Sequence, residues 1–206
     1  DHLADHILKA RDAALGRSEH YMRVGALSWD RQDILGRSSA SVFKGHFNNS
    51  KVCAIKKISH SGVPAERHRC EEEVKRLVAL QDLPHSQNII QYYAHEESVD
   101  CFYVAMELAD GGTLRDLAAR EALGPWRQRK HFCRQLCNGL LALHNQASIV
   151  HRDLKPENVL FVSTKRGRGE SVAKETFYPF TLKIADFGLS RSINASQSKF
   201  VSSAGA

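Results

Sequence analysis

From Arg31 onward, apolar residues occur in short runs that are typical of β-strands. The runs QDILG, SVFKGHF and KVCAIKKI are separated by polar turns, and two further β-rich runs, NIIQYYAH and CFYVAMEL, come later. Asn48 and Asn49 stand between the second and third runs, and asparagine tolerates the left-handed backbone that a tight hairpin requires. The pattern predicts three antiparallel strands joined by hairpins, followed by two more strands.

A helical period of about 3.6 residues replaces this pattern in three segments. Thr113 follows two glycines and is placed to cap a short helix, TLRDLAARE. The other two helices are predicted over residues 65–80 and from about Pro125 to His144. Their apolar faces are formed by Val74, Leu77, Val78 and Leu80 in the first helix, and by Phe132, Leu136, Leu140 and Leu143 in the second.

Two polar stretches follow neither period. Residues 1–28 are helix-prone at first and then irregular, so we interpret them as a leader or linker. Residues 163–180 contain the basic sequence KRGRG and no apolar period, which is typical of an inserted surface loop.

Composition excludes several classes of function. The chain has 206 residues, of which 42% are hydrophobic, and 29 basic against 23 acidic residues give a net charge of +6. The excess is spread along the chain, so we expect no direct binding of nucleic acid. No apolar run approaches the roughly 18 residues of a membrane helix, and the charged start is unlike a signal peptide. We therefore expect no membrane segment in this chain.

The five cysteines are odd in number, scattered and without a CxxC pair. This spacing favours neither disulfides nor a zinc site, and it indicates a cytoplasmic location, with a membrane anchor outside this chain left open. Cys133 and Cys137 lie four residues apart on the longest predicted helix. We expect both to pack inward as small apolar residues.

The strongest chemical signal is HRDLKPEN at residues 151–158, followed by DFG at residues 186–188. In this order the two motifs resemble the catalytic loop and the metal-binding triplet of eukaryotic protein kinases. The resemblance implies an α+β, bilobal protein-kinase-like fold, with a β-rich N-lobe containing one helix and a mainly helical, truncated C-lobe. It also implies phosphoryl transfer from ATP, which requires a base, cations near the phosphates and oxygen ligands for Mg²⁺.

The resemblance assigns a role to each matching residue of these motifs. Asp153 stands at the position of the catalytic base, and Lys155 at that of the lysine that contacts the γ-phosphate. Asn158 and Asp186 supply the hard oxygen ligands that Mg²⁺ prefers. Because tyrosine kinases place alanine or arginine near the position of Lys155, LKPEN indicates serine and threonine substrates.

A second cation is expected on the third predicted strand. Ala54, Ile55 and Lys56 match the end of the family's V-A-I-K motif, so Lys56 is assigned to the α- and β-phosphates. Lys57 is its rival by sequence alone. Strand alternation directs the two lysines to opposite faces of the sheet, and the match of Ala54 and Ile55 selects Lys56.

Three consecutive glutamates, Glu71, Glu72 and Glu73, lie at the distance expected for the helix glutamate that pairs with this lysine. We select Glu73 because the segment from Glu73 to Leu77 matches the family's E-x-x-x-L pattern. Glu71 is expected to pair with Lys75 on the exposed side of the helix.

The glycine-rich loop departs from the family pattern. Gly36 is kept, but Ser38 and Ser41 replace the second and third glycines. Serine lacks the backbone freedom that lets amides close over phosphates, so we expect weaker or slower ATP binding. The resemblance nevertheless assigns the following residues around this loop to the nucleotide: Leu35, Gly36, Arg37, Ser38, Val42 and Ala54.

The segment VAMELA at residues 104–109 resembles the hinge between the lobes of a kinase. Met106 corresponds to the gatekeeper. The backbone of Glu107 and Ala109 is expected to bind the adenine edge.

The resemblance also sets expected boundaries. The kinase domain spans residues 29–206, with an N-lobe at about 29–106, a hinge at about 107–112 and a partial C-lobe at 113–206. A complete domain continues beyond DFG through an A-P-E triplet. We therefore expect an incomplete domain, and we expect the chain by itself to have impaired activity and to aggregate or form a molten state.

Finer features resemble the inositol-requiring kinase/endoribonucleases of the unfolded protein response and ribonuclease L. They are NIIQYYAHEE, FYVAMELADGGTL, the expanded loop before LKIADFGLS, and the serine-rich segment 189–206. This resemblance implies trans-autophosphorylation within a homodimer and a role in stress signalling. Arg152 is expected to pair with a phosphoserine of that segment. None of the ribonuclease domain is present, so no ribonuclease activity is assigned.

We predict a protein serine/threonine kinase that uses ATP and Mg²⁺ and acts on a protein substrate. The alternative, motivated by the serine-substituted loop, is a nucleotide-binding pseudokinase scaffold that regulates an adjoining domain. A defective gene product is a third possibility.

Overall fold

The computed structural model describes residues 20–37, 40–60, 63–81, 86–120, 123–163 and 180–192. The chain divides into two compact units. The first contains Asp1–Cys70 and Tyr93–Leu108, and the second contains Glu71–Tyr92 and Ala109–Ala206. The helix-prone start of the predicted leader, most of the predicted insertion and the serines after residue 192 lie outside the described residues.

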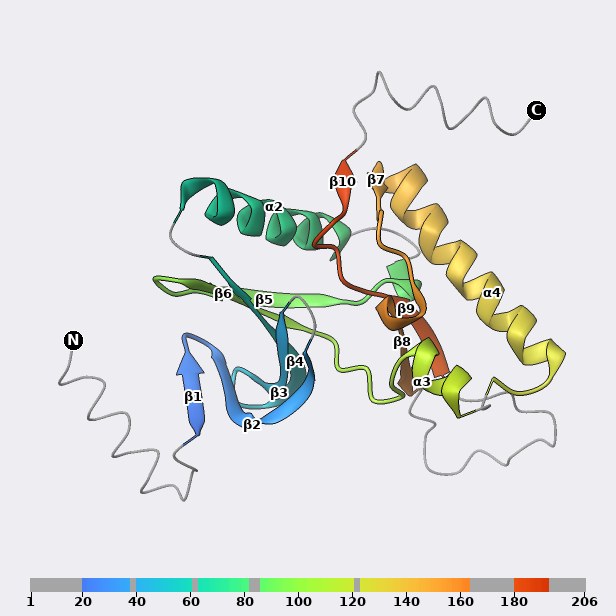
Figure 1. Ribbon diagram of the computed structural model, residues 1–206, viewed down its shortest axis with the longest axis horizontal. Coiled ribbons are helices and arrows are strands. Elements are labelled where there is room, and N and C mark those ends of the chain that lie inside the picture. The colour runs from blue at the N-terminus through green and yellow to red at the C-terminus, as the bar shows by residue number, and fades with distance from the viewer. Residues whose placement is uncertain are drawn as a thin grey trace. The chain divides into compact units, whose positions relative to one another are not determined.

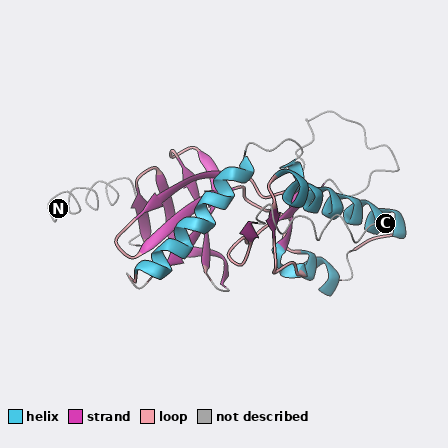
Figure 2. Ribbon diagram, turned by 90° about the horizontal axis from the view of Figure 1, so that it is seen from above, coloured by secondary structure: helices cyan, strands magenta, loops and turns pink. Residues whose placement is uncertain are grey.

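A six-stranded sheet forms most of the first unit, and its strands are drawn in magenta in Figure 2. The strand order is β1-β2-β3-β4-β6-β5, and the strands are labelled in Figure 1. The predicted strands are confirmed, although the sheet starts earlier in the chain than Arg31. The strands are β1 (Tyr21–Val24), β2 (Leu27–Arg37), β3 (Ser41–Phe47), β4 (Lys51–Ser59), β5 (Tyr92–Glu97) and β6 (Cys101–Met106).

Alternate side chains of these strands form a core on one face of the sheet. Phe43, Ile55 and Ala105 lie opposite one another across β3, β4 and β6, and all three are buried. Trp29 and Tyr103 join the same cluster, with ring centroids 4.8 Å apart. Since side chains alternate along a strand, the residues between these face the other side of the sheet.

The first hairpin of the sheet lies within the range 1–28 that the sequence assigns to a leader. Gly25 and Ala26 form its two-residue turn, and Gly25 has a φ of +53°. The Ala26 amide donates to Glu96 Oε1 at 3.0 Å, and the Asn48 amide donates to the Ala26 carbonyl at 2.9 Å. The turn is thus tied to β5 and to the next hairpin, whose asparagines have the positive φ values predicted for them.

Helix α2 (Pro64–Gln81) confirms the first predicted long helix. Val74, Leu77 and Leu80 are buried as expected. Val78 was expected on the same face, but its side chain is 41% exposed. It follows Leu77 by about 100° around the helix axis, which turns it away from the buried stripe.

Lys75 of α2 forms an exposed ion pair with Glu72, and the charge of Glu71 also raises the pKa of Lys75. Lys75 Nζ lies 2.9 Å from Glu72 Oε1, an i,i+3 contact, where the sequence predicted Glu71. Both spacings bring side chains together on a helix. Of the three neighbouring glutamates, only Glu73 is buried. Burial therefore distinguishes Glu73 from Glu71 and Glu72 more clearly than the surface ion pair does.

The second unit contains the other two predicted helices. Thr113 caps α3 (Leu114–Ala119) with a capping box, in which the Asp116 amide donates to Thr113 Oγ1 and the Thr113 amide donates to Asp116 Oδ2. Helix α4 (Trp126–Leu141) continues into a π-helical turn, η2 (Ala142–Gln146). Phe132 and Leu143 are buried, while Leu136 and Leu140 are half-buried.

The expectation that Cys133 and Cys137 pack inward is wrong, because both are exposed. The buried side of α4 is formed by Gln128, Phe132, Gln135 and Gly139. The prediction failed because it assumed that only apolar side chains face inward, whereas Gln128 and Gln135 are buried. All five cysteines are free.

Two short strand pairs complete the second unit. Strand β7 (Ile149–Val150) pairs with β10 (Arg191–Ser192), and β8 (Val159–Ser163) pairs with β9 (Phe180–Ile184). Figure 1 shows β8 and β9 beside α3 and α4. Phe132, Val159, Phe161 and Leu182 form the core between these elements. A sheet-rich unit followed by a unit of helices and short strands confirms the expected α+β fold class.

A buried amide network joins α4 to β9 and to the short helix η1 (Ser86–Asn88). Gln135 Oε1 accepts from Asn88 Nδ2 at 3.0 Å and from the Leu182 amide at 2.8 Å. Asn88 Nδ2 also donates to the Leu182 carbonyl at 2.9 Å. Gln135 therefore supplies the acceptor for the buried Leu182 amide and a second acceptor for Asn88 Nδ2.

None of the helices in the described ranges is both long and apolar enough to cross a membrane.

We predict that Gly25→Ala destabilises the first unit by about 1–3 kcal/mol, because a Cβ there would collide with the Glu96 carboxylate at a positive φ. Urea unfolding of the protein at its full natural length measures this change. Gly36→Ala is the matched control, since its Cβ would meet nothing within 4 Å and should change the stability by less than about 0.5 kcal/mol. Equal effects of the two substitutions would contradict the described turn.

We predict that Gln135→Leu destabilises the second unit by about 2–3 kcal/mol, because it removes the acceptor of the buried Leu182 amide and one of the two acceptors of Asn88 Nδ2. The melting temperature should fall accordingly. Arg134→Leu introduces the same side chain at the neighbouring exposed position and should leave the melting temperature nearly unchanged. A Gln135→Leu protein that melts like the wild type would show that the network is unimportant for stability.

Candidate active site

Two loops of the second unit carry the HRDLKPEN and DFG motifs. Residues 151–158 join β7 to β8, and residues 185–190 join β9 to β10. Because β8 pairs with β9 and β7 with β10, the two loops begin and end beside each other. The Ala185 amide also donates to the Asn158 carbonyl at 2.9 Å. The fold therefore brings together two motifs that lie about 30 residues apart in the sequence.

The Asp153 carboxylate is held through one of its oxygens. Lys155 Nζ lies 2.7 Å from Asp153 Oδ2, and Asn158 Nδ2 lies 3.0 Å from the same oxygen. Asn158 Nδ2 also donates to the Asp153 carbonyl at 2.8 Å. Within the described part of the chain, no side chain bonds to Oδ1. One oxygen anchors the side chain, and the other is available to accept a hydrogen bond from a hydroxyl group.

These contacts keep both Asp153 and Lys155 charged. The hydrogen bond from Lys155 is the largest cause that lowers the pKa of Asp153, and the one from Asn158 adds to it. The same hydrogen bond raises the pKa of Lys155. At neutral pH the pair therefore presents a carboxylate that can accept a proton next to an ammonium group.

Asn158 and Asp186 are the candidate metal ligands. Asn158 is buried and uses its amide nitrogen for Asp153, so these contacts do not occupy its Oδ1. Asp186 has a φ of +64°, a backbone conformation that is costly for a residue with a Cβ. An amide oxygen and a carboxylate fit the preference of Mg²⁺ for hard oxygen ligands, which it usually combines with waters and phosphate oxygens. The described residues contain no group of three or more His, Cys, Asp or Glu side chains that could hold a metal alone.

His151 is a positioning residue that the sequence analysis did not assign. Its ring is buried, and Nε2 lies 2.9 Å from the Ala185 carbonyl. The Asp153 amide lies 3.3 Å from Nδ1, and the ring centroid of Phe187 lies 5.2 Å away. A neutral ring that donates through Nε2 and accepts at Nδ1 satisfies both contacts. His151 thus links the backbone of Asp153 to the loop that carries Asp186, and its position inside the HRD triplet was the only sequence signal for it.

Arg152 fixes the start of the segment that follows DFG. It has a φ of +63°, and its Nε donates to the Leu189 carbonyl at 2.7 Å. The charge of Arg152 is one of the causes that lower the pKa of Arg76 on α2, although burial of Arg76 is the largest. Arg76 was not singled out by the sequence.

Glu73 reaches the DFG loop from α2. Its Oε2 lies 3.3 Å from the place where a Cβ on Gly188 would stand, and Asp186 Oδ1 lies 3.5 Å from the same point. Because Gly188 has no side chain, the carboxyl groups of Glu73 and Asp186 can both lie close to it. Lys56 belongs to the first unit and Glu73 to the second, so their pairing remains a prediction.

Five candidate nucleotide-binding residues share one face of the sheet. Val42 is directly opposite both Gly36 and Lys56, and Ala54 is directly opposite Met106. Ala54 and Lys56 are two residues apart on β4 and therefore point to the same side. This is the face away from the core that contains Phe43 and Ile55.

The alternation that favoured Lys56 over Lys57 is present in the register. Lys57 is opposite Tyr103, a member of the core cluster, whereas Lys56 is opposite Val104. Lys56 is buried and Lys57 is half-buried.

The structure says less about the other predicted nucleotide-binding residues. Leu35 is 48% exposed, and Arg37 ends β2. Ser38 lies outside the described residues. Glu107 and Ala109 are half-buried and fall in the first and second units respectively.

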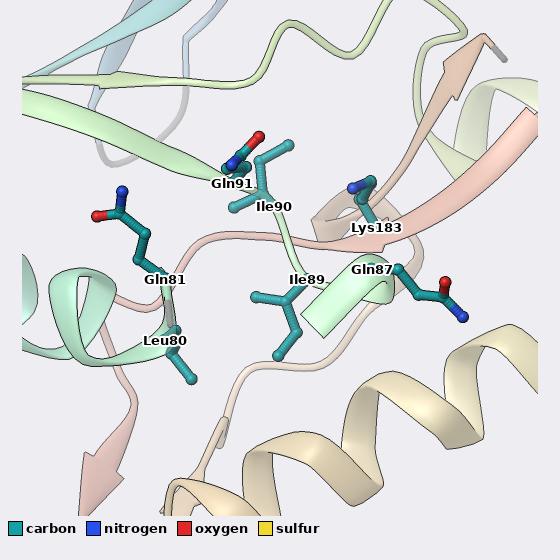
Figure 3. A pocket seen from close by; sticks show the side chains of 7 residues that line it. All are labelled: Leu80, Gln81, Gln87, Ile89, Ile90, Gln91 and Lys183. Atoms are coloured by element: carbon teal, nitrogen blue, oxygen red, sulfur yellow. The ribbon is translucent and has the colours of Figure 1, made fainter. Parts of the chain in front are cut away.

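A pocket of about 360 Å³ lies elsewhere in the second unit (Figure 3). The figure shows Leu80 and Gln81 at the end of α2, Ile89 and Ile90 after η1, and Lys183 on β9 around it. None of the candidate phosphoryl-transfer residues lines this pocket.

Comparison with known proteins is consistent with the motifs. A family model described as "Protein kinase domain" matches residues 29–205. The chain is 30% identical over 81% of its length to serine/threonine-protein kinase unc-51 of Caenorhabditis elegans, and 33% identical over 82% of its length to serine/threonine-protein kinase ULK1 of Homo sapiens. It is 29% identical over 81% of its length to mitogen-activated protein kinase kinase kinase 1a of Physcomitrium patens. The chain spans only 19%, 15% and 20% of these three relatives.

We predict that Lys155→Met raises the pKa of Asp153 towards its ordinary value, because it removes the hydrogen bond that lowers it most. The titration of the Asp153 carboxyl carbon, followed by NMR, should move to higher pH. Lys44→Met, at an exposed position of β3, should leave that titration unchanged. An unmoved titration in Lys155→Met would contradict the described contact.

Proposed function

Because the chain belongs to the protein kinase domain family, we propose that it transfers the γ-phosphoryl group of Mg·ATP to serine and threonine hydroxyl groups of a protein substrate. Family membership and the names of its relatives support a protein serine/threonine kinase. The observation that carries the proposal is the Asp153 carboxylate, anchored at Oδ2 by Lys155 and Asn158 and open at Oδ1.

In this proposal Asp153 acts on the acceptor hydroxyl. Oδ1 accepts its hydrogen bond, orients its oxygen and takes the proton as that oxygen bonds to the γ-phosphorus. The bond from the γ-phosphorus to its bridging oxygen breaks, and ADP leaves with the electron pair. Because its pKa is lowered, the Asp153 carboxylate is ionised at physiological pH and can accept the hydrogen bond that orients the hydroxyl group.

The cationic residues stabilise negative charge on the phosphates. Lys155 lies next to the base and is assigned to the γ-phosphoryl group, and Lys56, supported by Glu73, to the α- and β-phosphates. Bound Mg²⁺ would offset the remaining charge, with Asn158 and Asp186 as its protein ligands. Leu35, Val42, Ala54 and Met106 would contact the adenine, and the backbone of Glu107 and Ala109 its polar edge.

We also propose regulation by trans-autophosphorylation within a homodimer, in a cytoplasmic stress-signalling pathway. The support is the resemblance to the unfolded protein response kinases and ribonuclease L, together with Arg152, whose guanidinium already contacts the start of the serine-rich segment. Phosphate on a serine of that segment would add charge that pairs with arginine.

A pseudokinase scaffold is the alternative, because Ser38 and Ser41 replace two glycines of the phosphate loop. Binding of Mg·ATP would then stabilise the protein without phosphoryl transfer. Thermal-shift titration with Mg·ATP beside a transfer assay separates the two, since ligand binding alone raises the melting temperature.

We predict that Asp153→Asn lowers the rate of radiolabel transfer from ATP to a protein substrate by about a thousandfold, because asparagine cannot accept the proton. The protein should be assayed at its full natural length. Asp33→Asn, an exposed change on β2, is the control and should leave the rate unchanged. Transfer that is the same in Asp153→Asn and wild type would refute the assignment.

A further inference from the structure

An ion pair that the proposed reaction does not use lies beside the candidate base. Arg115 of α3 bonds through Nη1 to Glu157 Oε1 of the short helix η3 (Pro156–Asn158). Glu157 is two residues from Lys155, whose pKa is also raised by the charge of Glu157. Asp153, Lys155, Glu157 and Arg115 thus form a series of alternating charges that runs outward from the base.

The carboxylates near the outer end of this series are already engaged. The Glu157 carboxylate accepts a hydrogen bond from its own backbone amide and one from Arg115, and these contacts lower its pKa. Asp116, on α3 next to Arg115, accepts from the amide and the hydroxyl of Thr113. A basic group on a substrate would therefore have to share these carboxylates with Arg115 and Thr113.

Arg115 and Lys155, by contrast, have unused hydrogen-bond donors. A guanidinium group has five N–H donors and an ammonium group has three. Arg115 uses one of its donors on Glu157, and its side chain is 70% exposed. Lys155 uses one on Asp153, and its side chain is 47% exposed.

We propose that Arg115 selects acceptor peptides that carry an anionic side chain, either a carboxylate or a phosphate, close to the target serine or threonine. This inference rests on the proposed function and names its substrate class. An anionic group gains charge-assisted hydrogen bonds to the unused donors of Arg115. A cationic group that approaches Glu157 would stand next to the guanidinium group of Arg115, and this contact between like charges disfavours it.

Peptide binding tests this without requiring phosphoryl transfer. Fluorescent peptides in which alanine replaces the acceptor serine, and in which the flanking residue is aspartate, phosphoserine, alanine or arginine, are titrated with the full-length protein. Binding is measured by anisotropy at low salt. We expect the anionic peptides to bind about fivefold more tightly than the arginine peptide, the size of effect that an exposed ion pair produces. The aspartate and phosphoserine arms show which anion is preferred.

Three variants make the test specific. Arg115→Gln should reduce the preference to about onefold, while Arg127→Gln, at an exposed position of α4, should retain it. Glu157→Gln should retain or increase it, because it releases further donors of Arg115. Melting temperatures check that each variant is folded.

Two results would overturn the proposal. One is tighter binding of the arginine peptide that Glu157→Gln abolishes, which would make Glu157 the selecting residue. The other is an anionic preference that survives Arg115→Gln. Because the peptides have no acceptor hydroxyl, these results are independent of phosphoryl transfer, and loss of the proposed catalytic activity would be detected separately by the Asp153→Asn comparison.

Discussion

The hydrogen bond between His151 Nε2 and the Ala185 carbonyl joins the loop of the candidate base to the loop of the candidate metal ligand. Its geometry places a neutral imidazole between them, because the second ring nitrogen accepts from the Asp153 amide. The ring is buried and packs near Phe187, so it has little freedom to move. One buried side chain that takes no part in the chemistry itself therefore connects the loops of Asp153 and Asp186 within the second unit.

Backbone strain is concentrated in the same place. Arg152 and Asp186 have φ values of +63° and +64°, and each such residue costs about 1–3 kcal/mol. The cost is offset by contacts that fix both loops: Arg152 to the Leu189 carbonyl, the Ala185 amide to the Asn158 carbonyl, and the strand pairs at the loop ends. Glycine would adopt these angles without strain, but it would lack the guanidinium of Arg152 and the carboxylate of Asp186. Side-chain chemistry at these two positions is thus retained at the expense of local backbone energy.

Sequence periodicity and motifs predicted the parts of the structure that local rules determine. Five of the six strands of the sheet, α2, α4 and the cap at Thr113 follow from apolar period and capping residues, and the two loop motifs follow from their order. Predictions failed where a contact distant in sequence decides the outcome. Gln135 is buried because Asn88 and Leu182 satisfy its amide, and this turns Cys133 and Cys137 towards solvent. The first hairpin depends on Glu96, about 70 residues after its turn, and no local pattern could reveal that partner.

The candidate site therefore combines two kinds of interaction with different energetic weight. Buried contacts of His151 and Asn158 fix the backbone, and breaking them leaves polar groups without partners at a cost of about 1–3 kcal/mol each. The pairs of Asp153 with Lys155 and of Arg115 with Glu157 are exposed, and water and salt screen such pairs, so they contribute little to stability. The charges that face a substrate can consequently be altered without unfolding the loops that hold them. Chemistry and substrate choice are in this respect separable from folding, because they depend on the exposed charges and folding depends on the buried hydrogen bonds.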